Sequence, residues 1–244
     1  MDSIFYPTAA AVAWATLIFQ LVHGRILTRP SRYSLVRRSF LFALAGLCGA
    51  TTFGTPAIYA AFDKAVGQPN LARLFQHIGI LIFSVSIEAM LAFWARNTKA
   101  QRLIKFRIIA LGAVVIAMTI LFLSASVDVE TSKFTIIYGD NPYIVVYLAL
   151  YLIWFGSTLW HIVSITWRYR TADRVLRIGL RITAVGACLG LGYCFEKALY
   201  ILTRSFHINF ISPSFQETIS PALSGTGAIA LFIGLSIPPI NGIY

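Results

Sequence analysis

The sequence predicts an all-α, polytopic membrane protein: one bundle of seven transmembrane helices, with the N-terminus outside and the C-terminus inside the cell. Three observations predict this fold. The composition is 58% hydrophobic and only 12% charged, with a mean hydropathy of +0.75, far from the values of a soluble domain. Seven apolar runs are long enough to cross a bilayer, and basic stretches separate them in a regular rhythm. The whole chain, 1–244, is therefore expected to be a single multi-pass domain in the cell membrane.

A membrane-spanning helix needs about 20 predominantly apolar residues, and each of the seven runs approaches that length. No alternation of apolar and polar residues runs through them, which disfavours a transmembrane barrel, whereas helices satisfy their own backbone hydrogen bonds in lipid. The predicted spans lie near Ile4–His23, Ser39–Phe62, Leu71–Ala95, Ile108–Val127, Pro142–Trp167, Ile182–Thr203 and Thr218–Ser236.

The orientation follows from the positive charges, because basic loops stay on the cytoplasmic side. Three connectors hold five cations each, 15 of the 20 in the chain. They are Arg25, Arg29, Arg32, Arg37 and Arg38; then Arg96, Lys99, Arg102, Lys105 and Arg107; then Arg168, Arg170, Arg174, Arg177 and Arg181. Acidic residues gather on the other side: Asp2, Asp63, Asp128, Glu130, Asp140 and Glu217.

The formal net charge of +11 is accounted for by this orientation, so no nucleic-acid partner is predicted; nucleic-acid binding would call for a basic face on a soluble fold. The lipid bilayer is the expected partner, and the basic loops are expected to attract anionic lipid of the inner leaflet. A cytoplasmic protein partner at these loops is a further expectation.

Small residues at a spacing of four let helices approach closely in lipid. Gly46, Ala50 and Gly54 show this spacing in the second span, and Gly186 and Gly190 show it in the sixth. Packing within one bundle is the preferred interpretation, and a homo-oligomer is the alternative.

Two prolines fall inside predicted spans and are expected to kink them. Pro56 lies in the second span, and Pro221 lies near the outer end of the seventh. The three cysteines, Cys48, Cys188 and Cys194, also fall within spans, and we expect them to be structural.

Ionisable residues within spans are costly and therefore point to function. At about 1.5 Å of rise per residue, His77 and Glu196 share the outer depth, whereas Glu88 and His161 share the inner depth. These four, with Lys197 as a weaker member, are the candidate ligand or proton pathway. The alternative is a set of satisfied hydrogen bonds between helices.

Several chemistries lack their sequence signatures. The last span holds no lysine for a retinal Schiff base. Two histidine pairs share a depth, His23 with His161 and His77 with His207, but His207 is expected in a loop, so a haem is not predicted. Phosphate-binding loops, zinc helices and nucleophile elbows are absent from the sequence. The chain is therefore expected not to be an enzyme, and neither a catalytic residue, a metal nor a cofactor is predicted.

Three segments carry a resemblance to a family. They are Thr55–Tyr59 with Asp63 and Gly67–Leu74, then Leu176–Ile182 running into Gly186–Tyr193, and Gly234–Pro238. In these segments the chain resembles an actinobacterial family of seven-helix membrane proteins described as transporters. The resemblance implies extracellular-side roles for Asp63 and Asn70, and for His77 beside them. Family members usually continue past the last helix into a C-terminal cytoplasmic domain, whereas this chain stops at Tyr244. The resemblance therefore implies that the chain corresponds to the membrane domain alone.

The function expected from the sequence is a membrane sensor or receptor-like module that binds a small ligand or proton and signals to a cytoplasmic partner. A secondary, proton-linked transporter is the first alternative, although we find no convincing repeat between the first three and the last three spans. A structural subunit of a membrane complex is the second alternative.

Overall fold

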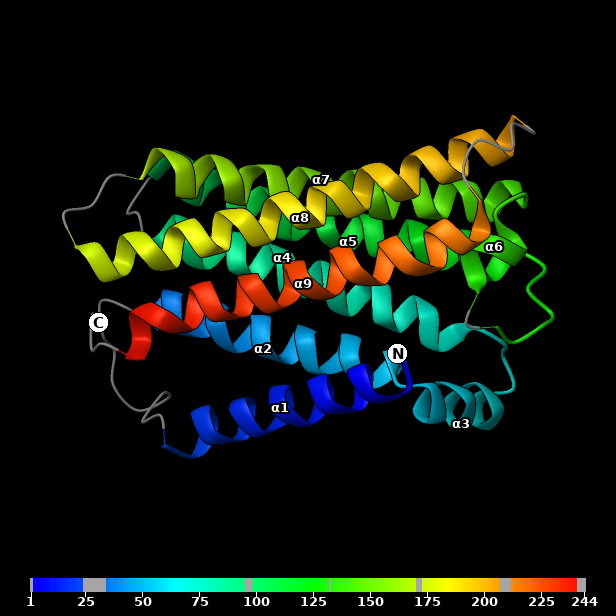
Figure 1. Cartoon of the computed structure of the whole chain (residues 1–244), viewed down its shortest axis with the longest axis horizontal. Helices are drawn as coiled ribbons and strands as arrows, with labels where there is room; N and C mark the ends of the chain where they lie inside the picture. The colour runs from blue at the N-terminus through cyan, green and yellow to red at the C-terminus, as the bar shows by residue number, and fades with distance from the viewer. Residues whose placement is uncertain are drawn as a thin grey trace. The chain divides into compact units, whose positions relative to one another are not determined.

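A computed structural model describes residues 2–23, 34–94, 98–131, 133–169, 173–206 and 212–240. Within these ranges the chain forms nine α-helices (Figure 1). They are α1 (Asp2–His23), α2 (Ser34–Gly54), α3 (Pro56–Val66), α4 (Leu71–Trp94), α5 (Thr98–Ser124), α6 (Phe134–Tyr138), α7 (Pro142–Arg168), α8 (Arg174–Ser205) and α9 (Pro213–Ile240).

Five helices are long and apolar enough to cross a membrane, and α2 with α3 makes a sixth if this bent pair is one span. The five lie within α4, α5, α7, α8 and α9. The all-α, polytopic membrane class predicted from the sequence is thereby confirmed. The apolar part of α1, Tyr6–Val22, falls in a shorter class of apolar helices, so the count of seven spans and the orientation of the termini stay predictions.

The second predicted span is broken rather than only kinked. The helix α2 ends at Gly54, α3 begins at Pro56, and the two are bent by 82°. Thr55 between them has an extended backbone. Proline has no N–H to continue the α2 hydrogen-bond ladder, but it is well suited to the first position of a new helix. The expectation of one helix running through to Phe62 is therefore wrong.

Several helices extend further than the apolar runs. The α5 helix begins at Thr98 rather than near Ile108, and α8 begins at Arg174 rather than near Ile182. Asp173 caps α8, because its side chain accepts hydrogen bonds from the backbone N–H groups of Val175 and Leu176. The predicted connector cations that lie on these two extensions are Lys99, Arg102, Lys105 and Arg107 on α5, and Arg174, Arg177 and Arg181 on α8. Arg25, Arg29, Arg32, Arg96 and Arg170 lie outside the described residues.

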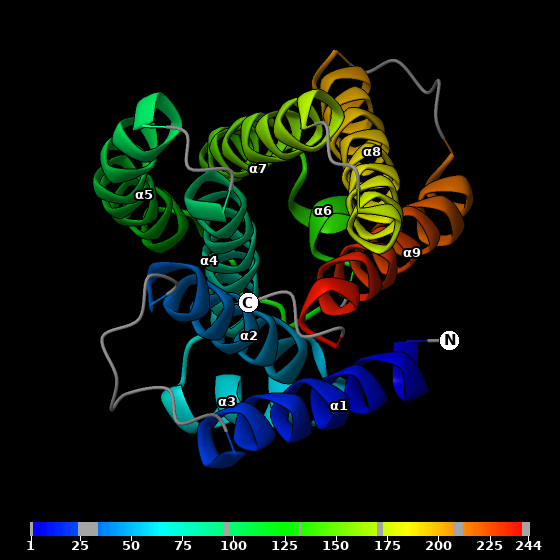
Figure 2. The same ribbon diagram turned by 90° about the vertical axis from the view of Figure 1, so that its left-hand side faces the viewer.

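The chain divides into two compact units, 1–151 and 152–244, with the boundary inside α7. In the first unit, α2 packs along α4 (Figures 1 and 2). A Cβ atom on Gly46 would lie 2.6 Å from the backbone nitrogen of Phe83 and 2.8 Å from the carbonyl oxygen of Gly79. A Cβ on Gly79 would in turn lie 2.7 Å from the nitrogen of Ala50. The two backbones are therefore in direct contact.

In the second unit, α8 and α9 lie side by side (Figures 1 and 2). A Cβ on Gly186 would lie 2.7 Å from the nitrogen of Leu231 and 2.8 Å from the carbonyl oxygen of Gly227. A Cβ on Gly227 would lie 3.1 Å from the carbonyl oxygen of Gly186. Glycine-mediated packing, predicted for both regions, is confirmed within each unit. The prediction of a single domain over the whole chain stays a prediction.

Candidate functional site: buried polar clusters

Asn70 is the centre of a polar cluster in the first unit. It is fully buried and has a φ of 61°, a left-handed conformation that asparagine tolerates better than most residues. Its Oδ1 accepts hydrogen bonds from the Tyr59 hydroxyl at 2.8 Å and from the Thr131 N–H at 3.0 Å. Its Nδ2 donates to the Val129 carbonyl at 2.8 Å. Asn70 therefore ties α3 to the segment that follows α5.

Asp63 secures the other side of the same turn. This buried carboxylate on α3 accepts a hydrogen bond at 2.8 Å from the N–H of Ala72, in the first turn of α4. Anionic groups are favoured at a helix N-terminus, where backbone donors lack partners. The Arg73 guanidinium lies over the Tyr59 ring, 5.3 Å from its centroid. The contacts of Asp63 and Asn70 explain how the α3–α4 turn is held together.

His77 lies on α4 against two tyrosines of α7. Its Nδ1 is 2.6 Å from the Tyr147 hydroxyl, and its ring stacks on Tyr151 with the centroids 4.2 Å apart. All three side chains are buried. A neutral imidazole beside a phenol can pass a proton along a hydrogen bond, so this group is suited to proton transfer as well as to packing.

Glu88 on α4 pairs with Arg107 on α5, with Arg107 Nε 2.9 Å from Glu88 Oε2. Both side chains are almost completely buried. The prediction that Arg107 belongs to a basic connector is therefore wrong. A lone buried carboxylate is very unfavourable in a low-dielectric interior, and an arginine beside it provides the opposite charge that burial requires.

Glu196 on α8 belongs to a second cluster, in the second unit. It is 7% exposed, and its Oε2 accepts a 2.5 Å hydrogen bond from the Ser220 hydroxyl on α9. Its other oxygen, Oε1, is buried and has no hydrogen-bond partner among the described residues. Gln216, one turn before Ser220, is 2% exposed, and within the same part of the structure neither of its amide atoms has a partner.

The remaining predicted residues lie on the same two helices as this cluster or beside them. Lys197 is half-buried, with Nζ 6.0 Å from the centroid of the Tyr193 ring. His161 lies on α7 and is half-buried. His77 and Glu88 belong to the first unit, and His161 and Glu196 belong to the second. The pairings suggested by equal depth, Glu88 with His161 and His77 with Glu196, stay predictions.

Several side chains of these clusters were not predicted from the sequence, among them Arg107, Tyr147, Gln216 and Ser220. Arg107 carried a signal, because it lies at helical spacing on the stripe formed by the buried residues Ile104, Met118 and Phe122. Tyr147 and Gln216 carried none, since tyrosines are common in membrane helices and Gln216 precedes the apolar run of its helix.

No group of three or more histidine, cysteine, aspartate or glutamate side chains is placed to hold a metal ion within the described ranges. Of the histidines considered for haem, His207 lies outside the described residues. The three cysteines have free thiols, and Cys48 and Cys194 are buried.

Comparisons with protein-family models, with curated proteins and with solved structures found no match to this chain. The resemblance to an actinobacterial transporter family therefore stays a prediction. The buried polar clusters must be interpreted from their own chemistry. The length and apolar character of its helices make the protein a multi-pass helical membrane protein with five or six candidate spans.

Proposed function

We propose that this protein is a membrane sensor that binds a small ligand or a proton at a buried carboxylate and responds by changing its helix packing. The observation that carries the proposal is the state of Glu196. One of its oxygens is bonded to Ser220, and the other is buried without a hydrogen-bond partner among the described residues. A buried polar group of this kind is unfavourable unless something binds it.

The position of Glu196 supports a coupling between ligand binding and the packing of α8 against α9. Its bond to Ser220 crosses from α8 to α9, and these two helices are otherwise held by direct backbone contact at Gly186 and Gly227. A ligand that competes for the carboxylate has a different affinity for each arrangement of the two helices. Such a difference is what allows a ligand to shift a conformational equilibrium.

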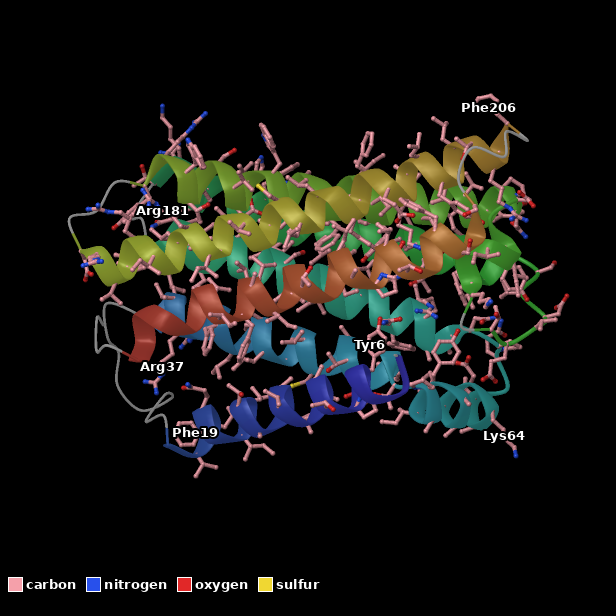
Figure 3. The ribbon with its side chains drawn as sticks, in the orientation of Figure 1. Tyr6, Phe19, Arg37, Lys64, Arg181 and Phe206 are labelled. Atoms are coloured by element: carbon pink, nitrogen blue, oxygen red, sulfur yellow. The ribbon has the colours of Figure 1, made fainter. Side chains whose placement is uncertain are left out.

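The basic helix extensions support signalling to a partner inside the cell. Lys99, Arg102 and Lys105 on α5 are exposed, as are Arg174, Arg177 and Arg181 on α8. Figure 3 shows Arg37 at one end of α2 and Lys64, on α3, beyond its other end. Since the exposed basic residues of α5 and α8 lie on helices rather than on loops, their positions would follow a movement of these helices.

Secondary transport is the second candidate, and the break between α2 and α3 favours it. Discontinuous helices commonly form the substrate sites of transporters, and this break changes the chain direction by 82°. The glycine contact found in both units also supports a repeated construction, which many transporters share.

Proteoliposomes containing the purified protein test both proposals, with Glu196→Gln as the paired variant. We measure thermal unfolding and internal pH across a panel of small amines, acids and sugars. A sensor is stabilised by one class of ligand without proton or solute flux, and Glu196→Gln removes that stabilisation. Flux that depends on Glu196 would favour transport, and the absence of both effects would contradict ligand binding at this residue.

A further inference from the structure

The face of α9 that meets Glu196 presents a second polar side chain. Gln216 and Ser220 are four residues apart, so they lie on the same side of the helix, one turn from each other. Ser220 already bonds to Glu196. Gln216 is therefore placed one turn along α9 from the carboxylate, and its buried amide has no partner within the described residues.

The atoms of Glu196 and Gln216 that lack described hydrogen-bond partners determine which ligand could bind to both residues. Oε1 of Glu196 can only accept when the carboxylate is ionised, whereas Gln216 offers both a donor and an acceptor. This holds whichever way the amide is turned, because both of its polar atoms lack partners among the described residues. A complementary ligand must therefore donate to Glu196 and also accept from Gln216.

The charge of the site further restricts the chemical class of the ligand. Glu88 has Arg107 as its counterion, but no described residue forms an ion pair with Glu196. The neighbouring Lys197 lies over the Tyr193 ring. A positive group on the ligand would balance the carboxylate, and an anion would be repelled by it.

We propose that Glu196, Gln216 and Ser220 bind a small primary amine that also carries a hydrogen-bond acceptor, such as a hydroxyl group, close to its nitrogen. The ammonium group donates to Glu196, and the acceptor receives the Gln216 N–H. This inference rests on the proposed function, because it names the ligand class of the same site. A quaternary amine has no N–H to donate, and a bare alkali ion cannot accept from the amide.

The other buried polar groups give weaker support for a ligand site. Asp63 also has a buried oxygen, Oδ2, without a described hydrogen-bond partner, but its Oδ1 is engaged by the first turn of α4. Its role in the α3–α4 turn accounts for its position. The pair Glu88–Arg107 is already neutral as a unit.

The test uses the full chain in nanodiscs of phosphatidylcholine and phosphatidylglycerol, which contain no primary amine. Ethanolamine is the probe, and ethylamine, choline and ethylene glycol each lack one feature of the proposed ligand. Thermal unfolding followed by tryptophan fluorescence gives the dissociation constant for each compound. We expect ethanolamine to raise the Tm, ethylamine to bind at least about fivefold more weakly because it leaves the buried amide donor unpaired, and the other two to have no effect.

Two variants locate the binding. Glu196→Gln should abolish the Tm shift, and Gln216→Leu should make ethanolamine and ethylamine bind equally. Equal binding of all amines to the unaltered protein, or an unchanged preference in Gln216→Leu, would overturn the inference. A second nanodisc that contains phosphatidylethanolamine asks whether a lipid headgroup is the source of the amine; stabilisation there that Glu196→Gln removes would support the same chemistry.

The two proposals fail in different ways. If an acid or a sugar stabilises the protein through Glu196 while no amine does, the sensor proposal stands and the amine inference is wrong. If no compound acts through Glu196, and the Tm has no pH dependence that Glu196→Gln removes, both are wrong.

Discussion

The α2/α4 hairpin of the first unit and the α8/α9 hairpin of the second are joined by the same kind of contact. In each, two glycines from facing helices meet backbone to backbone: Gly46 with Gly79, and Gly186 with Gly227. The residue four positions after one glycine lies against the facing glycine in both cases. Without a hydrophobic effect between helices in lipid, such close packing is a main source of helix association.

The two hairpins differ beyond this glycine contact. Ten residues after Gly46 lies Pro56, where α2 has ended and α3 begins. Ten residues after Gly186 lies Glu196, and α8 continues through it without a break. In the first unit the buried charge of Glu88 is balanced by Arg107. In the second, Glu196 has only a hydroxyl partner among the described residues. Both hairpins are therefore joined by the same close contact, but the buried carboxylate of the first unit has a counterion and that of the second has one oxygen without a described hydrogen-bond partner.

The largest expected effect is loss of the ion pair in the first unit. Arg107→Met leaves the Glu88 carboxylate buried without its counterion, and we expect a loss of about 3–5 kcal/mol in the free energy of unfolding. Reversible unfolding in mixed micelles measures it. The double variant Glu88→Gln with Arg107→Met should recover much of the loss. If Arg107→Met alone were neutral, the ion pair would not stabilise the first unit.

Alanine at a contact glycine should destabilise each hairpin to a similar degree. In Gly79→Ala and Gly186→Ala the new methyl group meets backbone atoms at 2.7–2.8 Å, which cannot rotate away. We expect losses of roughly 1–3 kcal/mol for such overpacking, measured by the same unfolding experiment.

Gly49→Ala is the matched control for these substitutions, because a Cβ there would meet nothing within 4 Å. Alanine favours a helix over glycine by about 1 kcal/mol, so this variant should be neutral or slightly stabilised. Equal destabilisation of Gly49→Ala and Gly79→Ala would show that the close contact is not what joins the helices.

Asn70→Ala should weaken the α3–α4 turn by roughly 2 kcal/mol. It removes hydrogen bonds to Tyr59, Val129 and Thr131 and places alanine in a left-handed conformation. Asn70→Gly distinguishes the loss of these hydrogen bonds from backbone strain, because glycine adopts the left-handed conformation without strain. Hydrogen exchange of α3 should increase in both variants. Slow exchange in both would mean that other contacts hold α3.

The smallest effect on stability is expected for Glu196→Gln. Because Gln keeps an acceptor for the Ser220 hydroxyl and removes a buried charge, we expect a change of less than about 1 kcal/mol in the absence of ligand. Glu88→Gln, which leaves Arg107 without its counterion, is the matched comparison in the first unit. If both substitutions were equally destabilising, Glu196 would have a structural counterion as Glu88 does.

Much of the fold follows from short-range patterns. The lengths of the apolar runs predicted α4 and α7 closely, since a helix that is apolar over about 20 residues has few alternatives in lipid. The end of α2 was not predicted closely. A proline within an apolar run is compatible with either a kink or a break, and the tertiary structure has the break, with an extended Thr55 before Pro56.

Less of the candidate site followed from the sequence. The rarity of ionisable residues within spans was enough to select His77, Glu88 and Glu196, and all three are buried. Their partners were not predicted, because equal depth along helices restricts a contact in one dimension only. Which residues meet also depends on the rotation of each helix and on its neighbours.

The sequence by itself therefore determined the membrane class, long apolar helices such as α4 and α7, and the buried ionisable residues His77, Glu88 and Glu196, since hydropathy and charge act on each segment separately. Only the tertiary structure decided that Arg107 balances Glu88, that Tyr147 meets His77, and that Ser220 but no described cation meets Glu196. The physical reason is that a buried charge is stabilised by whichever group lies within a few ångströms of it, and that distance depends on how separate helices pack.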